Sequence, residues 1–131
     1  MPKVSRLQKS RLAEELTEAF HRATGFDREI FAIRFYEYEH GQTAAGGKLN
    51  PEFPYLHMLL YIPKITRKQK QAVVAELSRS FAHELGEPEW IPVIHIAEHP
   101  FDNVGVDGKL LTDMFPVLRD KEFYYSMEDE E

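Results

Sequence analysis

Two stretches of the chain match without a gap and decide its fold: Met1-Pro-Lys-Val-Ser-Arg-Leu-Gln-Lys9 and Ile62-Pro-Lys-Ile-Thr-Arg-Lys-Gln-Lys70. The constant separation of 61 residues continues to the end of the first half, where Gly47-Lys48-Leu49 matches Gly108-Lys109-Leu110. An internal repeat of this length indicates that one small structural unit was duplicated. Function is therefore best approached by comparing the two copies.

Each copy begins with a predicted amphipathic helix. Apolar residues recur at helical spacing between Ser5 and Thr24, and the same plan returns after Thr66, which has the chemistry of a helix N-cap. Gly25 and Gly86 follow the two helical patterns, as expected of glycines that terminate helices.

Three short segments rich in β-branched and aromatic residues predict strands over 30–38, 55–62 and 91–97. The near-continuous apolar run of 55–62 suggests a strand buried on both faces, and strand, helix and strand in this order form a βαβ unit with parallel strands. Glycine-containing segments at 41–49 and 103–110 predict hairpins.

The first copy has no counterpart of the strand predicted over 55–62, because a shift of 61 residues would place it before Met1. We expect this absence to leave a gap in the middle of the sheet. The C-terminal residues 123–127 are apolar and β-prone, so we expect either this segment or a neighbouring subunit to cover the exposed strand edge.

Composition and charge limit the functional classes. The net charge is −6, and the four acidic residues 128–131 account for much of it, leaving −2 for the rest of the chain. A near-neutral body gives no electrostatic case for nucleic-acid binding, although the basic residues 64–70 keep that alternative open. No apolar run approaches the roughly 18 residues needed to span a membrane. We see no signal-peptide pattern and expect a cytoplasmic protein.

No cofactor or metal site is predicted. The chain contains no cysteine, which excludes a disulfide framework and a thiolate zinc site. His95 and His99 lie on a predicted strand and at its exit, without the i,i+4 spacing of helical zinc ligands. His57 lies within an apolar strand and is interpreted as a core residue.

The order and spacing of several short motifs resemble the 4-oxalocrotonate tautomerase family. In the second half these are Pro54-Tyr-Leu-His-Met-Leu-Leu-Tyr-Ile62, Arg67-Lys-Gln-Lys70 and Asn103-Val-Gly-Val-Asp-Gly108. In the first half they are Arg6-Leu-Gln-Lys9 and Ala44-Ala-Gly-Gly47.

The chain thus looks like a fused member of the tautomerase superfamily. The resemblance implies an α+β fold of tandem β-α-β repeats, with a mixed sheet backed by two antiparallel helices, and a homotrimer. We expect one domain over 1–131, with repeat halves 1–50 and 51–111 and a C-terminal extension over 112–131.

The resemblance also implies a catalytic base. The family uses an N-terminal proline exposed by removal of the initiator methionine, and its secondary amine can be the free base near neutral pH. Pro2 follows Met1, although the repeat pairs Pro2 with Pro63 at the end of a strand. The family's position falls near Pro54, whose nitrogen is an internal amide.

The remaining site residues follow from the same resemblance. The position of the family's first carboxylate-binding arginine lies two residues before Arg6 in one copy and before Arg67 in the other. The position of its second such arginine lies two residues before Arg34 and before His95. We therefore expect Pro2, Arg34 and His95 to be catalytic, with Arg6 and Arg67 holding the substrate carboxylate.

The sequence predicts a tautomerase that interconverts enol and keto forms of a small 2-oxo carboxylate. Both helices begin with several cations, a pattern that favours a small anionic substrate. The alternative is a non-catalytic oligomeric scaffold of the same fold that binds an anionic ligand or a protein partner.

Overall fold

Two helices of equal length form one layer of the molecule. The computed structural model describes residues 1–49, 55–86 and 91–116. Helix α1 spans Arg6–Thr24 and helix α2 spans Arg67–Leu85, so their first residues lie 61 positions apart, as the repeat predicts. Side chains of α1 and α2 contact each other in antiparallel order, with Arg22 beside Glu76 and Arg11 beside Glu84.

The helix ends are fixed by the same devices in both copies. The side chain of Ser5 accepts a hydrogen bond from the backbone N–H of Gln8, and the Gln8 side chain accepts one from the backbone N–H of Ser5. Thr66 and Gln69 form the same capping box at the start of α2. These reciprocal bonds satisfy backbone donors that a helix start leaves without partners.

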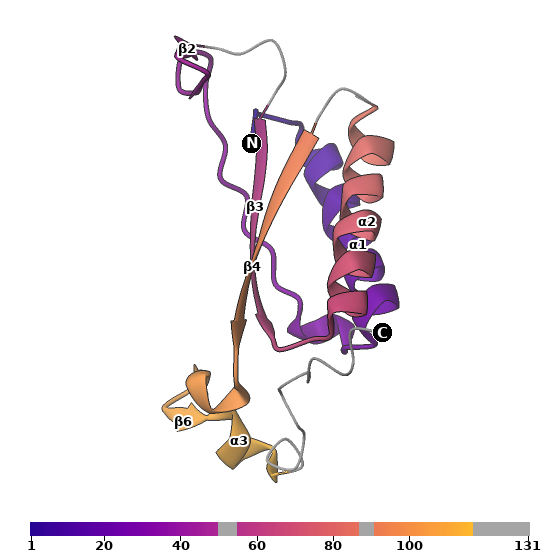
Figure 1. The fold of residues 1–131 in the computed structure, drawn as a ribbon, viewed down its shortest axis with the longest axis vertical. Helices are drawn as coiled ribbons and strands as arrows, with labels where there is room; N and C mark the ends of the chain where they lie inside the picture. Colours follow the sequence, from indigo (N-terminus) through magenta and orange to yellow (C-terminus); the bar gives the residue numbers. More distant parts are fainter. Residues whose placement is uncertain (50–54, 87–90, 117–131) are drawn as a thin grey trace.

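A parallel ladder of two long strands forms the second layer. Strand β3 spans Tyr55–Pro63 and strand β4 spans Ile91–His99. They pair in register along their whole length and are connected through α2, which confirms the predicted βαβ unit. Figure 1 shows α1 and α2 on one side of β3 and β4, so the predicted α+β class with helices backing a sheet is confirmed.

The hydrophobic core lies between the helix layer and the strands. Its buried members come from both helices, from β3 and from the turn before α2: Leu12, Leu16, Ala19, Phe20, Leu56, Leu60, Ile62, Ile65, Val73, Leu77 and Phe81. Within the described residues, no helix is both long and apolar enough to cross a membrane.

Two short hairpins occupy equivalent positions in the two copies. Strands β1 (Ala44–Ala45) and β2 (Lys48–Leu49) pair in the first half, and β5 (Gly105–Val106) and β6 (Lys109–Leu110) pair in the second. Both predicted hairpins are therefore confirmed. Figure 1 shows them at opposite ends of the molecule, with β6 followed by the short helix α3 (Leu111–Met114).

The prediction of a strand over 30–38 is wrong in its pairing. Residues Arg28–Ile30 form a 3-10 turn, η1, and 31–38 is extended but forms only one isolated bridge, between Pro2 and Tyr38, within the described residues. A second such turn, η2, spans Phe101–Asn103. The bridge is the repeat equivalent of Pro63 and His99 at the end of the β3–β4 ladder. Within the described residues, no strand lies beside 31–37 as β3 lies beside β4.

The expectation that 55–62 is buried on both faces is also wrong for the single chain. Leu59 and Tyr61 are 51% and 71% exposed, whereas Leu60 and Ile62 are buried. The helices cover only one face of β3, so its residues alternate between core and surface. The predicted role of 123–127 in covering a strand edge falls outside the described residues.

Candidate active site

The N-terminal amine lies against the extended segment 31–38. The Met1 amine donates a hydrogen bond to the carbonyl oxygen of Tyr36 at 2.8 Å, and the N–H of Tyr38 donates to the carbonyl of Met1 at 2.8 Å. Partial burial lowers the pKa of this amine from the ordinary 8.0, and the negative charge of Glu37 opposes that shift. Near neutral pH, a larger fraction of this amine is therefore the free base than would be the case for a fully exposed N-terminus.

Glu37 ties the end of this segment to the start of α1. Its carboxylate forms an ion pair with Lys9 and accepts a hydrogen bond from the N–H of Val4 at 3.0 Å. The Lys9 bond, followed by the Val4 bond, lowers the pKa of Glu37 below its ordinary 4.5. In the second copy, Glu98 forms the same ion pair with Lys70 and accepts from the N–H of Ile65 at 3.1 Å.

Pro2 is half-buried and bridges to Tyr38. Its nitrogen belongs to the peptide bond with Met1, so it becomes a secondary amine only when Met1 is removed. The residues on either side of Pro2 hold the N-terminal arm (residues 1–3) against segment 31–39: the Met1 amine donates to the carbonyl of Tyr36, and the exposed Lys3 pairs with Glu39.

Arg34 lies on the solvent side of segment 31–38. The side chains of Phe31, Ile33 and Phe35 pack against the core, whereas the alternating residues Arg34 and Tyr36 are exposed. This alternation puts the guanidinium on the side away from the helices, four residues from the Tyr38 position that Pro2 contacts.

His95 is exposed on the ladder face away from the helices and forms a pair with His57. A ring nitrogen of each faces the other at hydrogen-bond distance, and the ring centroids are 4.6 Å apart at an interplanar angle of 78°. The interpretation of His57 as a core residue is therefore wrong. His57 lies two residues before Leu59 and four before Tyr61, so the alternation of a strand puts all three on the same exposed face. The apolar residues of β3 are almost continuous, so the sequence does not reveal this alternation.

Arg6 and Arg67 are the exposed first residues of α1 and α2. Because the helices are antiparallel and 19 residues long, these two guanidinium groups lie at opposite ends of the helix pair. Within one chain, Pro2 therefore contacts the extended segment that carries Arg34, whereas Arg6 and Arg67 lie far from each other. Among the other basic residues near the helix starts, Lys9 and Lys70 are held by carboxylates.

Solved structures similar to this chain include fused 4-OT proteins. The F6 fused 4-OT, solved as a wild-type asymmetric trimer, is 27% identical with a TM-score of 0.75, covering 88% of this chain and 94% of its own. The R7 fused 4-OT, also a wild-type asymmetric trimer, is 28% identical with a TM-score of 0.72, covering 87% and 94%.

A third similar structure is N1, a member of the cis-3-chloroacrylic acid dehalogenase family. It is 20% identical with a TM-score of 0.69, covering 90% of this chain and 92% of its own, and this likeness concerns the fold alone. Comparisons with protein-family models and with curated proteins give no match. The structural similarities confirm the resemblance to fused members of the tautomerase superfamily that the sequence motifs indicate.

Proposed function

We propose that this protein is a tautomerase that interconverts the enol and keto forms of a small 2-oxo carboxylate, with its N-terminal amine as general base. The observation that carries the proposal is the position of that amine, which is partly buried against Tyr36 with a lowered pKa. A base is most effective when its pKa lies near the working pH. The fold supports the proposal but does not by itself assign a reaction.

The reaction needs one group that accepts and then returns a proton. In the enol-to-keto direction, the amine takes the proton of the enol hydroxyl, and the resulting ammonium delivers a proton to the neighbouring carbon. The substrate gains and loses one proton, so no redox partner is required. When Met1 is removed, the secondary amine of Pro2 takes this role beside Tyr38.

Cations are needed for the substrate carboxylate and for the oxygen that becomes negative during transfer. Arg34 is the candidate nearest in the chain to the segment that contacts Pro2, and a guanidinium can bind a carboxylate through two parallel bonds. The same charge stabilises an enolate oxygen. His95, hydrogen-bonded to His57, is the alternative acid or base on the exposed face of the ladder.

We propose a homotrimer in which the exposed face of the β3–β4 ladder contacts a neighbouring subunit. Leu59 and Tyr61 expose 51% and 71% of their surface on this face. The F6 and R7 fused 4-OT proteins were solved as trimers. Because Arg6 and Arg67 lie at opposite ends of the helix pair, a trimer would let one of them join Arg34 from another subunit.

Oligomerisation is tested by sedimentation of the wild type and of Tyr61→Glu. We expect the wild type to sediment as a trimer and the variant to dissociate, because a buried unpaired carboxylate is costly. Ser10→Glu, an exposed position on α1, is the matched control and should leave the assembly intact. A monomeric wild type contradicts the trimer.

The base is tested by the intact mass after a limiting dose of 3-bromopyruvate. With no cysteine to compete, we expect one adduct at the N-terminal amine. Turnover is followed by loss of the ultraviolet absorbance of an enol 2-oxo acid. We expect Arg34→Ala to lower kcat/KM by about 100-fold or more, the effect of removing one oxyanion donor, whereas Arg28→Ala should not change it. A full-rate Arg34→Ala variant contradicts the assignment.

The second candidate function is a non-catalytic scaffold that binds an anionic ligand or a protein partner. One observation favours it: Arg6 and Arg67, expected to hold the substrate carboxylate, lie at opposite ends of the helix pair in one chain. This function predicts an intact trimer with retained Met1, no bromopyruvate adduct and no turnover. A single adduct at a Met-free terminus together with enol turnover contradicts it.

A further inference from the structure

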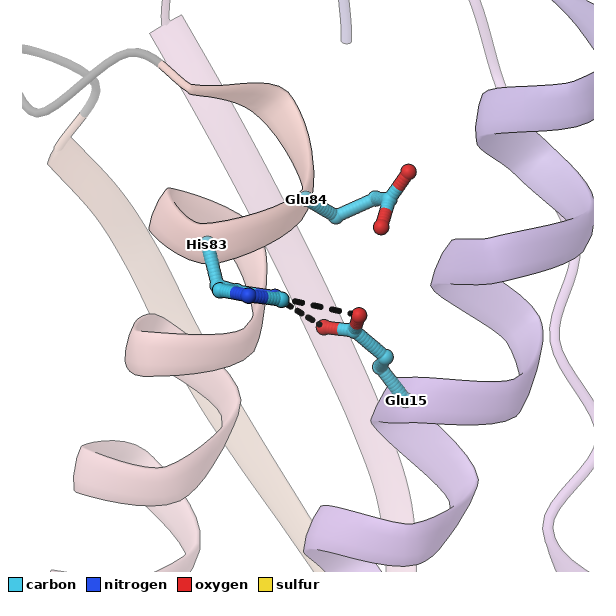
Figure 2. Close-up of side chains that lie close together, drawn as sticks. All are labelled: Glu15, His83 and Glu84. Carbon is cyan, nitrogen blue, oxygen red and sulfur yellow. Dashed lines mark hydrogen bonds and ion pairs between the residues drawn. The ribbon is translucent and has the colours of Figure 1, made fainter.

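Two carboxylates and one imidazole converge between the two helices, on the side of the molecule away from the strands. Glu15 comes from α1, and His83 and Glu84 come from the last turn of α2 (Figure 2). The Nδ1 atom of His83 lies 3.1 and 3.2 Å from the two carboxylate oxygens of Glu15. One potential ligand atom from each of the three residues lies within 4.8 Å of the others.

Glu84 is the unusual member of this cluster. Its side chain is only 8% exposed, and Figure 2 shows its carboxylate directed from α2 into the space between the helices, beside Glu15. Within the described part of the chain it accepts no hydrogen bond; its one ion-pair contact is the Nη1 atom of Arg11, 3.8 Å away. Buried carboxylates are normally hydrogen-bonded, closely paired or bound to a metal.

The repeat supplies an internal reference for this site. Glu76 is the equivalent of Glu15, and Arg22 is the equivalent of His83. The carboxylate of Glu76 accepts hydrogen bonds from Arg22 at 3.2 Å and from Arg79 at 2.8 Å, and these bonds, that of Arg79 first, lower its pKa. In that copy, two guanidinium groups of the chain itself neutralise one carboxylate.

The other copy lacks this arrangement. The equivalent of Arg79 is Glu18, which is paired with Arg28 instead, and the equivalent of Glu84 is Ala23. At the equivalent positions, the guanidinium of Arg22 corresponds to the imidazole of His83, that of Arg79 to the carboxylate of Glu18, and Ala23 to the buried carboxylate of Glu84. The site around Glu15 therefore has fewer cations and more potential metal ligands than the equivalent site around Glu76.

We propose that Glu15, His83 and Glu84 bind a divalent transition-metal ion, with Zn²⁺ as the probe. Imidazole nitrogen and carboxylate oxygen are established zinc ligands, and three protein ligands leave one coordination position for water. The ion would neutralise Glu84 and replace its long contact with Arg11. Zinc bonds are about 2.0–2.2 Å long, so the three ligand atoms, which lie within 4.8 Å of one another, would move closer together when the ion binds.

The location gives the ion access and a structural consequence. Glu15 and His83 line a cavity of about 480 Å³ between the helices, so an ion can enter from solvent. Because the ligands come from both helices, bound metal would cross-link α1 to α2. The sequence-based expectation of no metal site missed this cluster because Glu15 and His83 are far apart in the chain.

The test is a calorimetric titration of the metal-free full-length protein with Zn²⁺ near pH 7. We expect one ion per chain, bound about 10-fold or more weakly by Glu84→Gln, in the range seen when metal-site groups are altered, and no stoichiometric binding by His83→Ala. His57→Ala is the control, because the His57–His95 pair offers two imidazoles to an added zinc ion outside the proposed site. Circular dichroism checks that each variant is folded.

A second readout is thermal unfolding with and without Zn²⁺. We expect the ion to raise the Tm of the wild type and of His57→Ala, but not of His83→Ala, because a ligand that binds only the folded state stabilises it. Absence of wild-type binding overturns the proposal, as does binding that survives in both His83→Ala and Glu84→Gln. Loss of binding in His57→Ala alone would place the metal elsewhere. None of these outcomes depends on the proposed tautomerase activity.

Discussion

The carboxylate of Glu37 accepts a hydrogen bond from the backbone N–H of Val4 and thereby fixes the turn that leads into α1. The equivalent bond joins Glu98 to Ile65 before α2. Both copies also pair this carboxylate with the lysine on the first turn of the helix. This pair of contacts made by the carboxylate is therefore a property of the duplicated unit.

Glu37→Gln should lower the Tm at neutral pH, because the neutral amide loses the ion pair with Lys9. The pKa of Glu37 is lowered in the folded state, so its stabilising contribution is fully present above the ordinary 4.5 and is lost as the pH falls through the folded pKa. The Tm difference between wild type and variant should shrink in acid. Glu29→Gln makes the same charge change at an exposed position, and a difference independent of pH contradicts the prediction.

The N-terminal amine should titrate below 8.0 in chains that keep Met1, because its partial burial disfavours the charged form. The pH dependence of its reaction with an amine-specific reagent, followed by mass spectrometry of the N-terminal peptide, measures this pKa. Glu37→Gln removes the charge that opposes the shift, so the amine of that variant should titrate lower still. A pKa at or above 8.0 in the wild type would contradict the partial burial of the amine.

Leu16→Ala and Leu77→Ala should destabilise the protein by similar amounts. Leu16 and Leu77 are repeat equivalents, 1% and 0% exposed, in the core between helices and strands. Each truncation should cost about 2–5 kcal/mol, measured by denaturant unfolding. Leu7→Ala, at a position 59% exposed on α1, is the control and should change stability by less than about 0.5 kcal/mol. A core variant as mild as the control argues against the described packing.

Gly25→Ala and Gly86→Ala should each lower stability by about 1 kcal/mol, the cost of a left-handed backbone for a residue with a Cβ. The two glycines end α1 and α2 with φ angles of 73° and 64°. An added Cβ would meet no atom within 4 Å, so backbone strain alone should account for the loss. Gly105→Ala, without a positive φ, is the control. Equal stability of all three variants in urea unfolding would contradict this account.

The repeat made much of the fold predictable from the sequence. Local signals such as Ser5, Thr66 and the helix-ending glycines act over a few residues. Because the two copies are a constant 61 residues apart, an element predicted in one copy is also predicted in the other. The strand prediction over 30–38 was wrong because propensity describes one segment, whereas a ladder needs a partner. His57 was misplaced because an apolar run does not reveal which face is covered.

For the candidate sites, the residue types could be predicted from the sequence, but the tertiary contacts between those residues could not. Pro2 reaches the segment that carries Arg34 through a bridge to Tyr38, which depends on how the N-terminal arm docks. The contact of Glu15 with His83 depends on the antiparallel packing of the helices, which sets the two residues face to face. Such contacts follow from tertiary structure and leave no spacing motif in the chain.

The different strand pairing of the two halves has a consequence for how the chain folds. β3, α2 and β4 form a contiguous unit over 55–99, in which strand pairing is closed by one helical crossover, whereas α1 and 31–38 depend on contacts with residues made later. Because domains emerge from the ribosome in N-to-C order, the apolar stripe of α1 would wait without its sheet until the second copy is synthesised. The later half would then act as the template on which the earlier half folds.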